Sequence, residues 1–367
     1  MSVRHQPRSL KAIRYQSGVT LIELMIAMLI GLFVIGGMIS LFSTTQQTYR
    51  QQEGLWRVQE NGRFALELLS RDIREAGYFG CLGGYTSEAP RTNGALANGL
   101  IRNTLNPTPP AAPAFDVDFT ASLVGYQGDA ATGTWSPSLP TTSLITSPQA
   151  GSDILAISSI VNTGLVVTAH PGTPANPGSA NIQTTAGNGI VQGDILLVSD
   201  CQSGSIFQVT NANPNTSGSL VHNTGGGTSP GNWTTHLGRN YVDAEISRLQ
   251  RTVYYVAEDS GADDELTLFR NDTPLIEGVS RMLLLFGEDT DDDGVINRYV
   301  RADQVADMAN VLAVRINLLV GSAAKENVVS QVQFLPPPFG DGVTTPAPDR
   351  RLYQVFTTTV AIRNRLP

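Results

Sequence analysis

The sequence predicts an α+β fold, in which one long N-terminal α-helix with a membrane-spanning first half packs on a mostly antiparallel β-sheet head with long loops. Three observations lead to this prediction. Residues 19–42 form an apolar run, and residues 43–76 extend it in an amphipathic pattern without a proline. Eight strand-like runs follow later in the chain. The 36 glycines and 21 prolines have no collagen-like period, which indicates many loops rather than disorder.

Residues 1–18 form a basic leader. They include Arg4, Arg8, Lys11 and Arg14 and no acidic residue. The positive-inside rule therefore places the N-terminus in the cytoplasm and the chain after residue 42 on the other side of the membrane. A secretory signal peptide would have its small-residue cleavage site after the apolar run, whereas here the small-residue step is Gly18, before the run.

Residues 19–42 are long enough to cross a membrane as a helix. These 24 residues would make about 36 Å of helix, and a bilayer core is about 30 Å thick. Glu23 is the only charged side chain in the run. A carboxylate within a span costs about 2.5 to 3.5 kcal/mol even on forgiving scales, so we expect it to have a specific role. The alternative is an uncleaved signal anchor in which Glu23 reaches up to the headgroups.

The segment Gly18, Val19, Thr20, Leu21, Ile22 and Glu23 resembles the type III signal of the type IV pilin superfamily. The resemblance implies that prepilin peptidase cleaves after Gly18 and methylates the new N-terminal residue, Val19, which stands where the family usually has phenylalanine. Glu23 then becomes the fifth mature residue, the position that the family uses as an assembly contact. A carboxylate in lipid is tolerated when it is paired, and the free amine at Val19 of an adjoining subunit is the expected partner. Within one helix, Val19 and Glu23 are also four residues apart and could meet on one face.

Residues 43–77 are expected to continue the helix as an amphipathic extension. The apolar positions recur at three- and four-residue spacing, and Glu67 and Arg71 form an i,i+4 pair on a different face. Gly77 supplies a helix stop. The expected stripe consists of Leu55, Val58, Gly62, Leu66, Leu69 and Ile73.

Residues 78–367 are expected to form an extracytoplasmic head with loop-rich insertions. Residues 86–150 are rich in Ser, Thr, Pro, Gly and Ala and are interpreted as a loop-dominated insertion. A second, small β subdomain within the head is an alternative that the sequence allows. The expected strands are residues 153–161, 189–199, 205–210, 252–258, 266–270, 282–286, 311–320 and 352–362.

Residues 60–81 are similar to the end of the long helix in PilW-type minor pilins, and more loosely to that of the J-type minor pseudopilins of type II secretion. Residues 193–201 and 359–365 extend the similarity. The resemblance implies a minor pilin that acts in type IV pilus assembly or initiation, in a priming or tip complex, with roles in twitching motility and adhesion. The implied partners are other minor pilins, a tip adhesin-like protein, the major pilin and prepilin peptidase. The implied location is the bacterial inner membrane, with one span and a periplasmic head, and then the pilus at the cell surface.

Cys81 and Cys201 are the only cysteines. Both follow the membrane run and therefore fall in the oxidising periplasm on the expected topology, where a disulfide between them is plausible. Such a bridge would close a long loop and stabilise the head by roughly 4 to 5 kcal/mol on the loop-entropy model. The alternative is a pair of buried free thiols.

Residues 288–297 contain a candidate calcium loop. Asp289, Asp291, Asp293, the Val295 carbonyl and Asn297 have the spacing of the first half of an EF-hand loop, with glycine at its sixth position. The bidentate glutamate expected at the twelfth position is missing, since a valine stands there. The same residues also predict a β-hairpin, because Asp-Gly lies between two apolar runs.

Enzyme, zinc and nucleic-acid functions are disfavoured by the sequence. A G-x-S-x-G match at residues 227–231 lies in a Gly/Ser-rich loop, the histidines lack zinc-ligand spacing, and there is no Walker A motif. Removing the four leader cations takes the formal charge from −8 to −12, and Lys325 is then the only lysine. We therefore expect no enzymatic activity, no direct nucleic-acid binding and no required cofactor, with Ca²⁺ as the one candidate ion. The alternative functions are a J-type pseudopilin and a pilin-anchored, calcium-dependent adhesive module.

Overall fold

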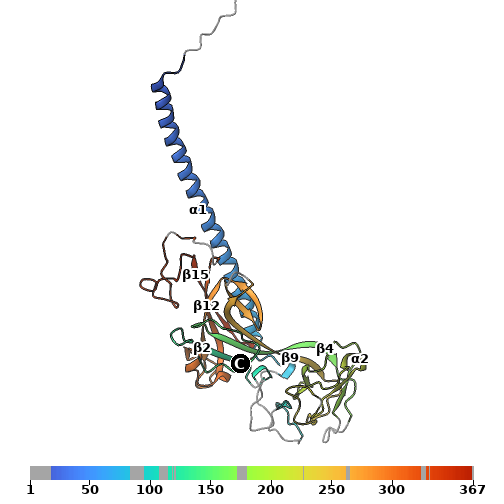
Figure 1. Cartoon of the computed structure of the whole chain (residues 1–367). Helices are drawn as coiled ribbons and strands as arrows, with labels where there is room; N and C mark the ends of the chain where they lie inside the picture. Colours follow the sequence, from blue (N-terminus) through green and yellow to red (C-terminus); the bar gives the residue numbers. More distant parts are fainter. Residues whose placement is uncertain are drawn as a thin grey trace, which may run out of the picture. The chain divides into compact units, whose positions relative to one another are not determined.

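The computed structural model describes residues 18–82, 95–106, 115–117, 119, 121–171, 180–225, 227–261, 265–323, 328–329 and 331–365 (Figure 1). The chain divides into two compact units, residues 1–53 and residues 54–367. A single helix begins in the first unit and ends in the second. The second unit holds the strands, and the α+β prediction is confirmed.

Helix α1 (Leu21–Arg74) is 54 residues long, which corresponds to about 81 Å. Between its apolar and amphipathic parts, the hydroxyls of Thr44, Thr45 and Thr48 each donate to the backbone carbonyl four residues earlier, so these polar side chains leave the helix intact. The helix ends at a left-handed glycine. Gly77 has φ +69° and donates its N–H to the Ser158 carbonyl at 3.0 Å, which ties the helix end to a strand of the head.

The amphipathic part of α1 buries a stripe that differs in detail from the expected one. Leu55 is 40% exposed, and Gly54 and Ala65 are buried instead. The small residues are needed because the helix approaches the sheet closely: a Cβ on Gly62 would lie 2.4 Å from the Phe356 ring. Arg71 pairs with Glu75 at 3.9 Å rather than with Glu67. The buried residues are Gly54, Val58, Gly62, Ala65, Leu69 and Ile73.

The largest sheet is mixed and runs β1-β7-β6-β9-β4-β2-β3, with β10 and β11 joined at β9. Its one parallel pair is β1 with β7, and the other described pairs are antiparallel. The strands are β1 (Ile101–Asn103), β2 (Leu123–Gly128), β3 (Trp135–Ser136), β4 (Ile154–Val166), β6 (Ile195–Ser199), β7 (Gly204–Gln208), β9 (Glu245–Asp259), β10 (Glu265–Arg270) and β11 (Thr273–Glu277).

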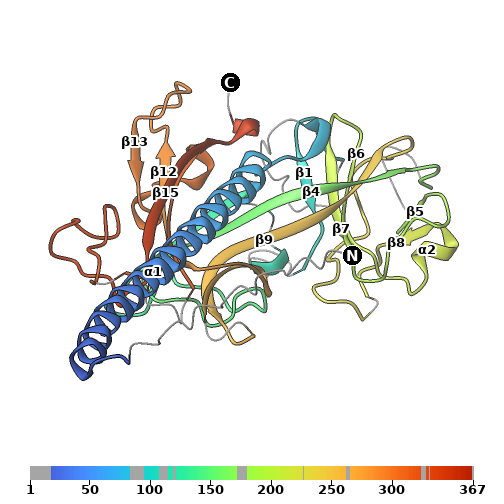
Figure 2. The same ribbon diagram turned by 90° about the horizontal axis from the view of Figure 1, so that it is seen from above.

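A second, antiparallel sheet runs β13-β12-β14-β15 and lies next to α1 (Figure 2). Its strands are β12 (Val279–Glu288), β13 (Arg298–Val300), β14 (Val311–Gly321) and β15 (Tyr353–Ala361). A small third sheet pairs β5 (Asn181–Gln183) with β8 (Ser219–Val221). The short helices are α2 (Pro214–Ser217), η1 (Gly80–Leu82), η2 (Phe115–Val117), η3 (Ala302–Gln304), η4 (Met308–Asn310) and η5 (Arg363–Arg365).

The head has two principal cores. The first joins the buried stripe of α1 to β2, β4, β9, β12, β14 and β15. The second lies within residues 165–246 and includes Phe207 and Tyr241. Strands β4 and β9 pair from Leu155 opposite Tyr254 to Val166 opposite Glu245, so these two long strands run from one core to the other. The second β subdomain that the sequence allowed therefore has its own core, but it shares β4 and β9 with the first core.

All eight expected strand runs contain a strand. The expected loop-dominated insertion at residues 86–150 contains more order than the sequence suggested, because β1, β2 and β3 lie within it. Within that insertion, residues 86–94, 107–114, 118 and 120 lie outside the described residues.

Candidate assembly and ion-binding sites

The N-terminus of α1 is closed by a capping box formed by Thr20 and Glu23. The Thr20 N–H and hydroxyl both donate to Glu23 Oε2 at 2.9 Å, and the Glu23 N–H lies 3.4 Å from Thr20 Oγ1. This reciprocal pattern satisfies backbone donors that a helix start otherwise leaves open. Both short bonds use the same carboxylate oxygen, so within the described part of the chain Oε1 of Glu23 has no hydrogen-bond partner.

The helix that follows Glu23 presents its apolar side chains to its surroundings. Among the described helices, α1 is the one that is long and apolar enough to cross a membrane, with a mean hydropathy of 2.5 over its most apolar window. Gly31, Gly36 and Gly37 have open space around them. A helix that is apolar on all sides and unburied among the described residues is suited to lipid or to the apolar helices of other chains.

Cys81 and Cys201 form a disulfide with an S–S distance of 2.05 Å and a Cα–Cα distance of 5.0 Å. Cys81 lies in η1, directly after α1, and Cys201 lies in the turn between β6 and β7. The Cys201 N–H donates to Ser199 Oγ at 3.2 Å. The bridge therefore links the end of the long helix to the large sheet across 120 residues of sequence.

The acidic loop after β12 gathers three carboxylates. Asp289, Asp291 and Asp293 each offer an oxygen, and these oxygens lie within 4.8 Å of one another. Asp289 is buried, whereas Asp291 and Asp293 are exposed. Carboxylate oxygens at this spacing suit a hard cation such as Ca²⁺. The other expected ligand side chain, Asn297, already accepts from the Thr290 N–H at 2.6 Å through its Oδ1.

Backbone N–H groups hold Asp289 in place. Its two oxygens accept from Asp291 at 3.2 Å, Asp292 at 2.8 Å and Gly294 at 2.7 Å. Burial raises the pKa of Asp289, but these hydrogen bonds outweigh it and leave the pKa below the ordinary value, so the carboxylate is charged. Gly294 has φ +82°, which permits the sharp turn that the loop makes.

The same loop is a hairpin, as its Asp-Gly turn predicted. β12 and β13 pair from Phe286 opposite Val300 to Glu288 opposite Arg298. Glu288 is 1% exposed and accepts from Arg298 at 2.8 Å and from the N–H groups of Ala306 and Asp307. Its negative charge is therefore compensated inside the head, whereas the exposed acids of the turn have no such cation among their hydrogen-bond partners in the described residues.

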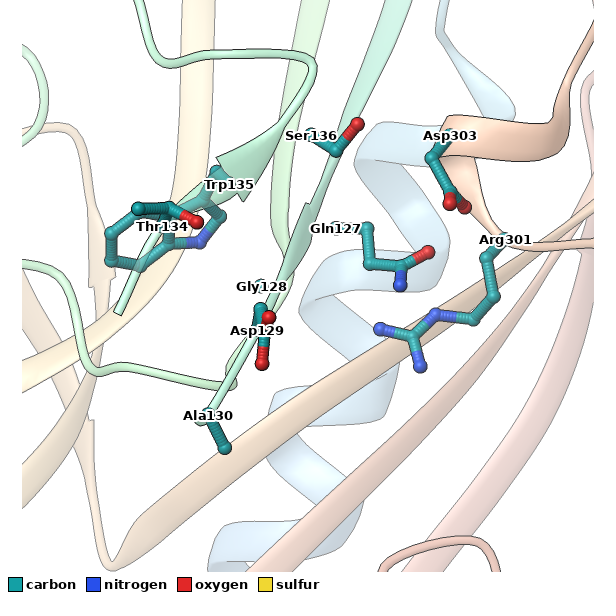
Figure 3. A pocket seen from close by; sticks show the side chains of 9 residues that line it. All are labelled: Gln127, Gly128, Asp129, Ala130, Thr134, Trp135, Ser136, Arg301 and Asp303. Atoms are coloured by element: carbon teal, nitrogen blue, oxygen red, sulfur yellow. The ribbon is translucent and has the colours of Figure 1, made fainter. Parts of the chain in front are cut away.

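A polar cleft of about 430 Å³ lies between the β2–β3 hairpin and η3. Figure 3 shows Gln127, Arg301 and Asp303 directed toward one another across it. At its edge Arg301 donates to Asp153 at 2.8 Å; burial raises the pKa of Asp153, and Arg301 opposes that effect. The Oε1 atom of Gln127 has no partner in the described part of the chain. The lining can exchange hydrogen bonds with a small polar molecule, but it has no nucleophile paired with a base.

Two buried histidines lie in the second core. His170 accepts the Tyr241 N–H at its Nδ1 atom at 3.1 Å. Burial, with a further contribution from His170, lowers the pKa of His222 to about 3, so His222 is neutral in the folded protein. Of the described His, Cys, Asp and Glu residues, the aspartates of the acidic loop are the group close enough to share a metal ion.

Sequence reasoning missed two features of these sites. Thr20 with Glu23 has the T-x-x-E spacing of a capping box, so this pair was readable from the sequence. The buried pair of Asp153 with Arg301 was not readable, because 148 residues separate its members.

Comparison with known proteins gives two family matches. Residues 13–39 match the prokaryotic N-terminal methylation motif, and residues 253–364 match the family described as Type IV Pilus-assembly protein W. No curated protein and no solved structure matches the chain. The first match contains Gly18, Val19 and Glu23, and the second runs from β9 to η5. Together they support a minor pilin of the PilW type.

Proposed function

We propose that this PilW-type minor pilin of the type IV pilus is cleaved after Gly18, is held in the inner membrane by residues 19–42, and enters or primes the pilus through Glu23. The observation that supports this best is the geometry of Glu23. It is the one charge in an otherwise apolar helix start, and its Oε1 atom is left open by the capping box. The role is structural rather than catalytic.

The open oxygen suits the amine of a neighbouring subunit. After cleavage, Val19 would carry a free, positively charged N-terminus, and such a group on an adjoining subunit can donate to Oε1 while Thr20 keeps Oε2. A paired carboxylate in an apolar environment is far less costly than an isolated one. The exposed apolar helices then bury against each other, and the glycines let their backbones approach closely.

The head suits a tip or initiating position better than the repeated shaft. Residues 78–367 are expected to lie outside the membrane, and the described part of them contains two cores. The match to the pilus-assembly family covers the sheet that packs on α1, whereas the second core, within residues 165–246, lies outside it. We therefore assign contacts with other minor pilins and the major pilin to the matched part. Contacts with a tip adhesin-like protein, and the roles in adhesion and twitching motility, are assigned to the complex as a whole.

Two measurements test this function. Mass spectrometry of the membrane-extracted protein should find a methylated Val19 at the N-terminus; an intact leader would refute processing at Gly18. The variant Glu23→Gln should be processed but fail to support pilus assembly. Glu53→Gln, an exposed acid further along the same helix, is the matched control and should assemble normally.

Deletion of the gene distinguishes this function from two alternatives. A J-type pseudopilin would leave surface pili intact and stop protein secretion. An adhesive module that merely shares the anchor would leave pili and secretion intact and reduce attachment. Loss of pili and of twitching is the outcome that we expect.

We also propose that the acidic loop binds Ca²⁺ weakly and thereby stabilises the β12–β13 hairpin. The supporting observation is that Asp291 and Asp293 converge on a buried Asp289 that is already held by backbone N–H groups. Sites of this kind outside the cell bind at about 0.1 to 1 mM. Millimolar Ca²⁺ should raise the Tm of the full-length chain in detergent, and Asp289→Asn should abolish the rise. Asp292→Asn, in the same turn but outside the cluster, should keep it, and an equal loss in both variants would refute the site.

A further inference from the structure

Strand β15 (Tyr353–Ala361) is an open edge of the second sheet. The strand order β13-β12-β14-β15 places it at the end of the sheet. It is nine residues long, and its sequence, Tyr-Gln-Val-Phe-Thr-Thr-Thr-Val-Ala, contains no charged residue and no proline. Soluble proteins usually protect an edge with such residues, because an unprotected edge is a template for a further strand.

The register shows which backbone groups point outward from this edge. The Ser322 N–H donates to the Leu352 carbonyl, and the Ile362 N–H donates to the Leu312 carbonyl, both at 2.9 Å. In an antiparallel ladder, hydrogen-bonded pairs alternate with non-bonded pairs. The even-numbered residues of β15 therefore bond to β14, and the odd-numbered residues direct their N–H and C=O groups away from the sheet.

Most of these outward groups have no partner. The Tyr353 N–H donates to Gln333 Oε1 at 2.8 Å, which closes the start of the edge. Beyond it, the backbone groups of Val355, Thr357, Thr359 and Ala361 bond to nothing in the described part of the chain. The last three of these residues are also exposed. The open row spans about 20 Å at 3.3 Å per residue.

We infer that β15 receives an added β-strand from a different protein. A row of alternating N–H and C=O groups is complemented by an extended peptide backbone, which can supply the same groups at the same spacing. The added strand would extend the second sheet beside α1, within the part of the chain that matches the pilus-assembly family. The open edge of β15 is thus a partner-binding surface of this chain. Only the exclusion of a second copy as the partner rests on the proposed pilin function.

A second copy of this chain does not suit the edge. Phe356 meets α1 at Gly62, and Asn364 donates to the Ala76 carbonyl at 3.3 Å, so β15 and α1 run in the same direction. If two copies paired through β15 about a two-fold axis, the outward-facing odd-numbered residues of one strand would lie opposite those of the other strand. Such an arrangement forms a regular ladder of hydrogen bonds only when the two strands are antiparallel. Their α1 helices would then run in opposite directions. Two pilins in one membrane must carry these helices in the same direction.

The surroundings of β15 indicate the chemistry of the added strand. The exposed side chains beside the open row are small and uncharged, which favours β-branched neighbours. Two of the described cations lie next to the C-terminal end of the strand. They are Arg315, whose Nε lies 3.3 Å from Thr359 Oγ1, and the exposed Arg363. We therefore expect a segment that is rich in β-branched residues and carries an acidic residue near that end as its one charge.

Photo-cross-linking in the intact cell tests the inference. The full-length chain is produced in its own host with p-benzoylphenylalanine in place of Thr357, and the cross-linked peptide is identified by mass spectrometry. The same photoreactive residue in place of Asp292 is the positional control. Two proline variants supply the structural comparison. Thr359→Pro removes an outward N–H and the exposed hydroxyl that accepts from Arg315, and leaves the backbone ladder to β14 intact. Thr358→Pro removes an N–H that bonds to β14.

The expected result is a cross-link to one extended segment of another protein, absent from the Asp292 control. Thr359→Pro should lower its yield about fivefold, as expected for the loss of about one hydrogen bond, with little change in the Tm of the purified chain. Thr358→Pro should lower the Tm itself. A cross-link to a second copy, no specific cross-link, or a yield unaffected by Thr359→Pro would each overturn the inference. Processing at Gly18 is measured in the same cells, so failure of the pilin function is recognised separately.

Discussion

The disulfide gives the largest single stability effect that we expect in the head. The bridge between Cys81 and Cys201 closes a loop across 120 residues. On the chain-entropy model, a loop of this length raises the free energy of unfolding by about 5 kcal/mol, because it restricts the unfolded chain. At about 2.1 cal/mol/K of unfolding entropy per residue, the 290 residues of the head shift their Tm by about 1.6 °C per kcal/mol, so the bridge should raise the Tm of the head by roughly 8 °C.

Differential scanning fluorimetry of the full-length chain in detergent measures this effect. The double variant Cys81→Ser with Cys201→Ser should melt roughly 8 °C below the oxidised protein, and the reduced natural chain should melt with it. Ser199→Ala is the matched control, since it removes only the hydroxyl that accepts the Cys201 N–H and should cost about 1 kcal/mol. A double variant that melts no lower than this control would refute the loop-entropy argument.

Three further predictions concern packing and charge. Gly62→Ala should lower the unfolding free energy by about 1 to 3 kcal/mol, because its Cβ would lie 2.4 Å from the Phe356 ring, and Phe356→Leu should relieve the loss in urea titrations. The pKa of His222 is lowered to about 3 in the folded chain, so stability should fall by about 3 kcal/mol between pH 7 and pH 4, and His222→Gln should flatten that slope. Arg301→Leu should cost about 3 kcal/mol at pH 7 because it leaves the buried carboxylate of Asp153 with its backbone hydrogen bonds but without this ion pair, and the loss should shrink in acid as that carboxyl is protonated.

The parts of the fold that were predictable are those determined by local sequence. α1 was readable because a helix makes its hydrogen bonds within itself, so apolar spacing and the absence of proline identify it. Strands such as β14 (Val311–Gly321) were readable because a long apolar run is buried on both faces. Leu55 was placed wrongly in the helix stripe because spacing alone does not show that Gly54 and Ala65 allow the sheet to come close.

Short strands and strand order depend on contacts that sequence does not display. β3 consists of Trp135 and Ser136 alone, and β1 is a three-residue strand that pairs in parallel with β7, about 100 residues away. Neither segment has an apolar pattern long enough to be distinguished from the Ser- and Gly-rich sequence around it. They are defined by pairing, β1 with β7 and β3 with β2. The open edge at β15 was hidden for the same reason, because edge position follows from pairing rather than from composition.

The acidic loop shows how one set of residues can satisfy two interpretations. The hairpin uses both oxygens of Asp289 to hold backbone N–H groups, which is the arrangement that a turn needs. Those bonds fix the buried carboxylate in place, while the backbone directs Asp291 and Asp293 toward it. Asp293 also holds the turn, because its Oδ1 accepts the Val295 N–H at 2.8 Å, but three carboxylates this close still repel one another. The Ca²⁺ proposed for this loop would offset that repulsion.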